Sequence, residues 1–156
     1  MAEFQAKLDT RWLSKIADFI EENAKSMGCN EPQTLFDLKL AVDEASTNIM
    51  RYGKNGQNTF TIRIEKQGPK TIQIEIIDHG KPYDFDHVTL PAPHLSIDEK
   101  LKHGFGIGLI KAVTENASYT AYPDKNILAF TKTLTKSEGT ASLGGNSNGN
   151  PRKKDK

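Results

Sequence analysis

The sequence predicts an α+β fold in which helices cover one face of a mixed, mostly antiparallel sheet, as a two-layer α/β sandwich. Two segments near the N-terminus carry apolar residues at intervals of three and four, which is typical of helices packed on one side. Residues 58–66 and 71–78 alternate apolar and polar side chains, which is typical of half-buried strands. A third helical segment and a closing pair of strands follow, and this order favours separate helix and sheet layers.

The chain begins with an expected strand over residues 3–8 and an expected helix over residues 9–28. Asp9 or Thr10 supplies the helix cap, because a short side-chain oxygen can accept from the exposed amides of the first turn. Gly28 ends the helix, since glycine adopts left-handed backbone conformations at little cost. The apolar stripe of this helix consists of Trp12, Ile16, Phe19 and Ile20.

A second helix is expected to begin at Pro32, because the first turn of a helix needs no amide donor there, and to stop at Gly53. Two alternating segments come next, joined by the short connection QGPK, and this predicts an antiparallel hairpin. The apolar stripe of the second helix consists of Leu35, Leu38, Val42, Ala45 and Ile49.

A long irregular stretch, residues 79–103, separates this hairpin from the third helix and contains three prolines. A loop of this length inside a compact domain is usually functional or mobile. The third helix is expected from near Ile107 to about Asn116. Residues 118–122 and 126–134 then form a closing hairpin around the turn PDKN.

Composition and charge bound the function classes. The chain has 156 residues and a net charge of +1, so no overall field recruits nucleic acid or an anionic membrane. The single Cys29 cannot form an internal disulfide and fits a partly buried residue in a reducing compartment.

The start resembles no signal peptide and no segment approaches transmembrane length, so we expect a cytoplasmic protein. Residues 1–136 form the expected domain, and residues 137–156, which are polar and basic, form an expected disordered tail.

The segment HGFGIGLIKAV opens the third helix with glycines at alternate positions, Gly104, Gly106 and Gly108. Glycine is poor in helices, so this pattern indicates close approach of a ligand, most often phosphate, to the backbone. The dinucleotide spacing fails, because its last glycine would fall on Leu109 or Lys111, and the Walker sequence is absent. A flexible turn before an ordinary helix is the alternative.

On the second helix, Glu44 and Asn48 are four residues apart and outside the apolar stripe, hence neighbours on one face. A carboxylate and an amide placed this way could activate a nucleophile and hold a hard cation through oxygen. A solvated helix face is the alternative.

A third polar group follows the strand that ends at Asp78, with Gly80 two residues later. A carboxylate at a strand end can accept a hydrogen bond from an exocyclic amine, and glycine lets a flat ring lie against the backbone. The alternative is an ordinary turn containing aspartate.

In their order and spacing, these three segments resemble the GHKL ATPase superfamily, the Bergerat nucleotide-binding fold shared by gyrase, the heat-shock chaperone and sensor histidine kinases. DEASTNIMRYG resembles the helix box of that family, DHGKPYD its adenine box and HGFGIGL its phosphate box. Within the superfamily the sequence most resembles the small bacterial anti-sigma-factor serine-protein kinases. The resemblance covers roughly residues 5–135.

The resemblance implies a site for ATP and Mg²⁺ with a separate role for each polar residue. Asn48 would ligate Mg²⁺ through its amide oxygen, and Asp78 would read the adenine amine with Gly80 beneath the ring. Glu44 would be the general base that accepts the proton of an incoming serine or threonine hydroxyl.

The three glycines resemble the hinge of an ATP lid over residues 85–103, and the amides of the helix beginning near Ile107 would face the phosphates. Thr131 or Thr133, on the last strand, could help bind near the adenine. Family kinases often carry arginine where Lys102 and His103 stand here, and lysine supplies a point charge to phosphate without a bidentate fork. This departure bears on phosphoryl transfer more than on nucleotide binding.

Three functions are compatible with the resemblance. The first is a serine/threonine-protein kinase that phosphorylates a small antagonist protein of the anti-anti-sigma type and sequesters a client such as a sigma factor. The second is an ATP-binding switch that controls partner exchange without phosphate transfer. The third, a detached histidine kinase catalytic domain, is disfavoured because no helix with a phosphoacceptor histidine precedes the fold.

Relatives suggest a homodimer, and neither nucleic acid nor membrane is an expected partner. The histidines lie in the lid or its flanks: His79, His87, His94 and His103.

Overall fold

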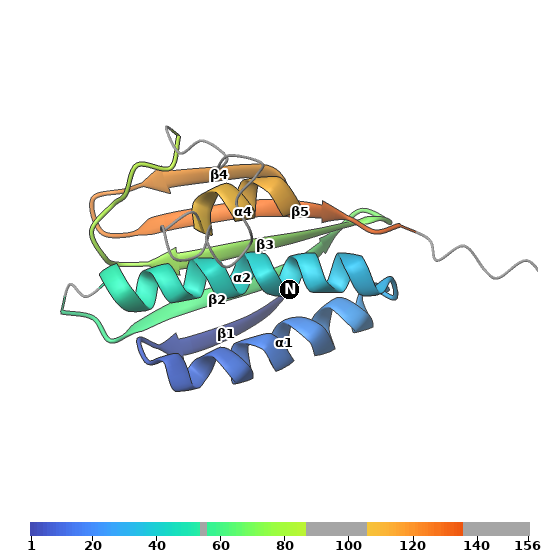
Figure 1. Cartoon of the computed structure of the whole chain (residues 1–156), viewed down its shortest axis with the longest axis horizontal. Coiled ribbons are helices and arrows are strands. Elements are labelled where there is room, and N and C mark those ends of the chain that lie inside the picture. Colours follow the sequence, from blue (N-terminus) through green and yellow to red (C-terminus); the bar gives the residue numbers. More distant parts are fainter. Residues whose placement is uncertain (54–55, 87–105, 136–156) are drawn as a thin grey trace, which may run out of the picture.

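The computed structural model describes residues 1–53, 56–86 and 106–135. Three helices lie side by side on one face of a five-stranded sheet, and together they form two layers (Figure 1). The expected α+β sandwich is therefore confirmed. The elements are β1 (Ala2–Lys7), the 3₁₀ turn η1 (Thr10–Trp12), α1 (Leu13–Ser26), α2 (Pro32–Tyr52), β2 (Thr59–Gln67), β3 (Thr71–Asp78), α4 (Gly106–Val113), β4 (Glu115–Ala121) and β5 (Asn126–Thr133).

The strand order is β1-β2-β3-β5-β4, and each of these neighbouring pairs is antiparallel. The expected hairpin of β2 and β3 pairs Ile62 with Ile76 and Ile64 with Ile74. The last hairpin enters the sheet with β5 against β3, so that Asn126 lies opposite Asp78. This crossover brings the start of β5 to the end of β3, where the sequence places a candidate binding residue.

The alternation of the strands separates an apolar face from a polar one. Ile62, Ile74 and Ile76 are fully buried beneath the helices. Each such side chain contributes about 1.5–3 kcal/mol through burial. On the opposite face Arg63 pairs with Glu3 at 2.7 Å, and both side chains are partly exposed to solvent.

The helix boundaries follow local signals with two differences from expectation. Asp9 is the cap, but it begins a 3₁₀ turn, and α1 starts only at Leu13. The third helix was expected to reach about Asn116 and instead ends at Val113. Asn116 has a positive φ of 52°, which a continuing helix cannot accommodate, and β4 begins irregularly at Glu115.

Candidate functional site

The α2 residues Glu44 and Asn48 face the first residue of α4. A Cβ atom added to Gly106 would lie 2.6 Å from Glu44 Oε2 and 3.3 Å from Asn48 Nδ2. The expected pairing of the two side chains on one helix face is therefore present, and Gly106 is the residue that lets α4 approach them. The same glycine that suggested a phosphate loop thus has a second role in packing the two helices together.

Asp78 ends β3 and is buried, with 6% of its surface exposed. Its Oδ1 accepts hydrogen bonds from the Gly80 amide at 2.7 Å and from Asn126 Nδ2 at 3.1 Å. Asn126, which is 1% exposed, also donates to the Gly80 carbonyl at 3.0 Å. Within the described ranges no hydrogen bond reaches Asp78 Oδ2, so one oxygen of this oriented carboxylate can accept from a ligand.

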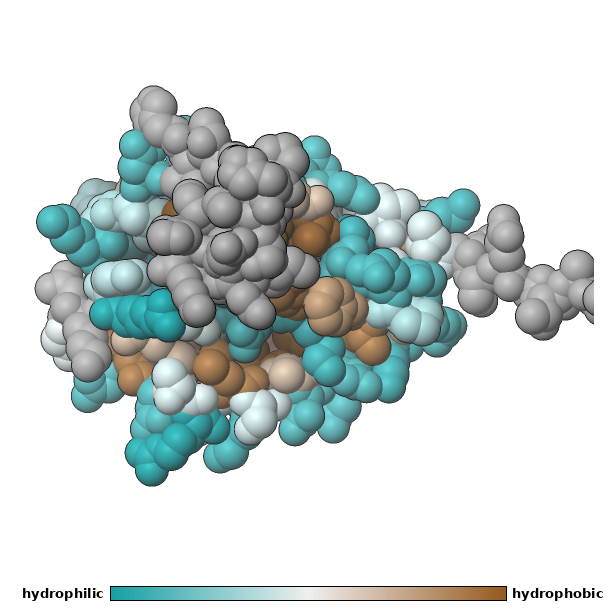
Figure 2. All heavy atoms as spheres, viewed as in Figure 1, coloured by the Kyte–Doolittle hydropathy of each residue, from teal (hydrophilic) through white to brown (hydrophobic). Residues whose placement is uncertain are grey.

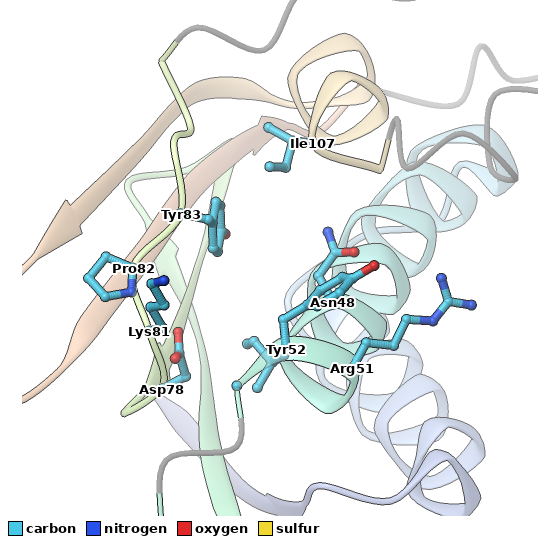
Figure 3. Close-up of a pocket in the computed structure, with 10 residues that line it drawn as sticks. Asn48, Arg51, Tyr52, Asp78, Lys81, Pro82, Tyr83 and Ile107 are labelled. Carbon is cyan, nitrogen blue, oxygen red and sulfur yellow. The ribbon is translucent and has the colours of Figure 1, made fainter.

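A cavity of about 370 Å³ lies between the end of α2, the segment after β3 and the start of α4 (Figure 3). This volume is within the usual range of small-molecule sites. Figure 3 shows Asp78 and Tyr83 on one side and Asn48 and Tyr52 on the other. Among the described residues, the cavity is lined by Asn48, Ile49, Arg51, Tyr52, Gly53, Asp78, Lys81, Pro82, Tyr83 and Ile107.

Acidic, neutral and basic side chains lie in and next to the cavity. Burial raises the pKa of Glu44, the neighbouring Asp43 charge raises it further, and the Arg51 guanidinium opposes this rise. A carboxyl with a raised pKa is a better proton acceptor when ionised than one at the ordinary value. Burial also raises the pKa of Tyr83, so its hydroxyl stays neutral at physiological pH. Lys81 and Arg51 contribute the positive charges among the lining residues.

Gly80 packs against backbone. A Cβ atom placed on it would lie 2.5 Å from Gly53 Cα and 2.8 Å from the Gly53 carbonyl oxygen. The missing side chain therefore permits contact between the end of α2 and the segment after β3. The sequence predicts a different reason for a glycine at this position, namely that a flat ligand ring lies against the backbone.

The remaining residues that the sequence singled out separate into two groups. Gly108 is buried within α4, whereas Lys102 and Gly104 lie outside the described residues. The structure does not bring Thr131 to the cavity. Its hydroxyl donates to the Glu115 carbonyl at 3.2 Å, and β5 registers it far along β3 from Asp78. Thr133 lies further still along the same strand and bonds the Glu115 carboxylate.

The sequence interpretation missed several residues of this site. The sequence predicts Asn126 at the junction of the PDKN turn and the last strand, but its contact with Asp78 depends on strand pairing that no local pattern displays. Arg51 and Tyr52 could have been found, because they follow Asn48 by three and four residues on the same helix. Lys81 and Tyr83 stand within the segment after Asp78 and gave no periodic signal.

Among the described residues, no three His, Cys, Asp or Glu side chains lie close enough together to bind a metal ion by themselves. A divalent cation bound near Asn48 would therefore need further oxygen ligands from a bound molecule, which phosphates supply. In the described ranges no helix is both long and apolar enough to cross a bilayer.

Comparison with known families matches residues 5–132 to the histidine kinase-like ATPase domain. No curated protein matches the chain significantly. Among solved structures, the RsbU and RsbW domains of a Mycobacterium tuberculosis protein superpose with a TM-score of 0.64 at 11% identity, over 88% of this chain and 34% of that one. The SiaB–SiaC complex of Pseudomonas aeruginosa gives a TM-score of 0.59 at 13% identity, over 86% of this chain and 90% of that one. At these identities the likeness concerns the fold, and this chain spans about a third of the M. tuberculosis chain.

Proposed function

The chain belongs to the histidine kinase-like ATPase domain family, and from this we propose that it is an ATP-dependent serine/threonine-protein kinase of the anti-sigma-factor type. It would phosphorylate a small antagonist protein and, in its other state, sequester a client such as a sigma factor. The P. aeruginosa structure with a similar fold is a complex of two proteins, SiaB and SiaC, which supports a protein partner here.

The observation that carries the proposal is the buried, oriented Asp78. Its Oδ1 is engaged by Gly80 and Asn126, whereas its Oδ2 has no partner among the described residues. An acceptor of this kind suits an exocyclic amine, which can only donate. We therefore assign the Asp78 and Tyr83 end of the cavity to adenine.

Asn48 and Glu44 would serve the other end of the nucleotide. Asn48 would ligate Mg²⁺ through its amide oxygen, and the bound ion would neutralise charge on the phosphates. The amides that begin α4 would face the same phosphates. Glu44, beside Gly106, would accept the hydroxyl proton of the substrate as the γ-phosphoryl group passes to that oxygen and ADP leaves.

A non-catalytic switch uses the same fold and cavity, and Lys102 in place of the arginine of family kinases favours it. The switch would bind Mg·ATP and exchange partners without phosphate transfer. Replacement of Glu44 separates the two functions, because only the kinase needs a general base.

The test uses γ-labelled ATP and the proteins encoded beside this one as candidate substrates. Glu44→Gln keeps the side-chain volume and should leave ATP affinity within about threefold, while phosphotransfer falls about a hundred- to ten-thousandfold. Asn48→Ala should weaken Mg·ATP binding under either function. Glu22→Gln, which removes an exposed acid on α1, is the control and should retain phosphotransfer.

Two results would contradict parts of the proposal. Phosphotransfer at the parental rate in Glu44→Gln would remove Glu44 from the catalytic role. Absence of labelled serine or threonine with every candidate, together with ATP-dependent partner exchange that survives Glu44→Gln, would establish the switch instead.

A further inference from the structure

Three aromatic rings form a continuous stack behind the cavity. Tyr83 lines the cavity, and its ring centroid lies 4.3 Å from that of Tyr119 on β4. Tyr119 in turn stacks on Phe85, with centroids 6.0 Å apart and ring planes at 24°. Phe85 is 3% exposed and belongs to the core. The cavity wall at Tyr83 is thus supported by a stack that ends at Phe85.

Lys111 connects this stack to α4. Its ammonium group donates to the Phe85 carbonyl oxygen and lies 4.4 Å from the centroid of the Phe85 ring. The lysine therefore contacts both the backbone and the side chain of one buried residue. A charge-assisted hydrogen bond and a cation–π contact at a partly buried position each stabilise such an arrangement.

The position of α4 depends on contacts of this kind. The helix has eight residues, and a helix of two turns has little stability of its own in water. At its N-terminal end Gly106 lies against Glu44 and Asn48, and Ile107 lines the cavity. One turn further along, Lys111 fastens the helix to the segment that carries Tyr83.

We propose that Lys111 is a positioning residue. It sets the distance between the cavity wall at Tyr83, which we assign to adenine, and the N-terminal end of α4, which would face the phosphates. This inference rests on the proposed nucleotide site. A ligand that reaches only the wall, such as adenosine, does not depend on this distance. ATP must contact both the wall and α4, so the contribution of its phosphates to affinity depends on Lys111.

The experiment measures the affinities of adenosine and Mg·ATP by calorimetry in the full chain. Lys111→Met keeps the aliphatic length and removes the charge and the donor. We expect Mg·ATP affinity to fall about 5- to 30-fold, while adenosine affinity stays within about twofold. Lys111→Arg, which keeps a cation and donors, should recover most of the difference. Lys15→Met is the matched control, because Lys15 also lies 4.4 Å from a ring centroid, that of Trp12 on the far side of the fold.

Hydrogen exchange without ligand gives a second readout. In Lys111→Met, but not in Lys15→Met, the amides of residues 83–86 and 106–113 should exchange faster. Unchanged exchange in both segments would overturn the inference, as would equal losses of adenosine and ATP affinity or no loss of either. Failure of the parental protein to bind adenosine or ATP would instead overturn the proposed function. The exchange data do not depend on a ligand, so they would still show whether Lys111 holds α4 against the segment that carries Tyr83.

Discussion

At the scale of single residues, the candidate site contains two carboxylates in different surroundings. Asp78 is buried and held by two donors, one from Gly80 and one from Asn126. Glu44 has no such donors among the described residues, and burial raises its pKa. The first is suited to reading a ligand and the second to accepting a proton, although both are acidic side chains near one cavity.

Replacement of Asp78 by Asn tests the proposed adenine-binding end of the cavity. The variant keeps the shape of the side chain but can present an amide donor to an amine that is itself a donor. We expect ATP affinity to fall roughly thirty- to a hundredfold, on the order of 2–3 kcal/mol. Calorimetry measures the effect, with Asp18→Asn on the exposed face of α1 as control. Binding within threefold of the parent would show that Asp78 does not read the base.

Replacement of Glu44 by Gln should also change stability in a pH-dependent way. Because the folded protein raises the pKa of Glu44, its ionised form is disfavoured by folding, and this cost is present at neutral pH. The cost disappears as the pH falls through the folded pKa toward the unfolded value of about 4.3. Glu44→Gln should therefore be more stable than the parent at pH 7, and this advantage should be gone below about pH 4.

Urea unfolding at the two pH values measures this difference. Glu22→Gln, on the exposed face of α1, is the control and should show no such dependence. A Gln variant that is less stable than the parent at pH 7 would mean that the Glu44 carboxylate makes favourable contacts in the folded state.

At the scale of elements, three contacts bring α2, α4 and the sheet together. Lys132 on β5 donates to Asp37 on α2 at 2.8 Å and to the Val113 carbonyl at the end of α4 at 2.7 Å. A cation at this end also suits the helix dipole. Gly80 and Gly106 supply the other two contacts, in which a missing side chain permits close approach.

Alanine at these two glycines should have different effects. At Gly80 the added Cβ would meet the Gly53 backbone at 2.5 and 2.8 Å, and backbone cannot move aside, so Gly80→Ala should lose about 1–3 kcal/mol of stability. At Gly106 the nearest atom is the end of the flexible Glu44 side chain. Gly106→Ala should therefore fold with nearly parental stability but lose phosphotransfer at least tenfold, because Glu44 is displaced.

Denaturant unfolding and phosphotransfer assays on both variants check this contrast. Equal destabilisation of the two variants would indicate that Glu44 cannot yield to the added methyl group. Parental phosphotransfer in Gly106→Ala would indicate that the position of Glu44 does not matter for the reaction.

At the scale of the whole molecule, the described helices lie on one face of the sheet (Figure 1), and the cavity lies between the end of α2, the segment after β3 and the start of α4. Figure 2 shows the helix face, on which apolar side chains are interspersed with a larger hydrophilic surface. The inward faces of the central strands and the helices form one apolar core, in which Ile62, Ile74 and Ile76 are fully buried.

A chain that stops after Lys136 should therefore keep the fold and the nucleotide site. Residues 137–156 lie outside the described residues, and the prediction rests on their composition, with Leu143 as their one large apolar residue. We expect the truncated chain to bind ATP within about twofold and to melt within about 2 °C of the full chain. A larger fall in the melting temperature would show that the tail packs on the domain.

The sequence by itself determined the layers, the helix faces and the hairpin, because these follow from short-range periodicity and from residues typical of helix starts, such as Asp9 and Pro32. It also determined that Glu44 and Asn48 share a face, since residues four apart on a helix are neighbours. Only the tertiary structure decided that Asn126 holds Asp78, that Gly80 lies on Gly53 and that Thr131 stands away from the cavity. These relations join residues tens of positions apart, and they depend on strand order and helix packing, which the whole core sets and no local pattern encodes.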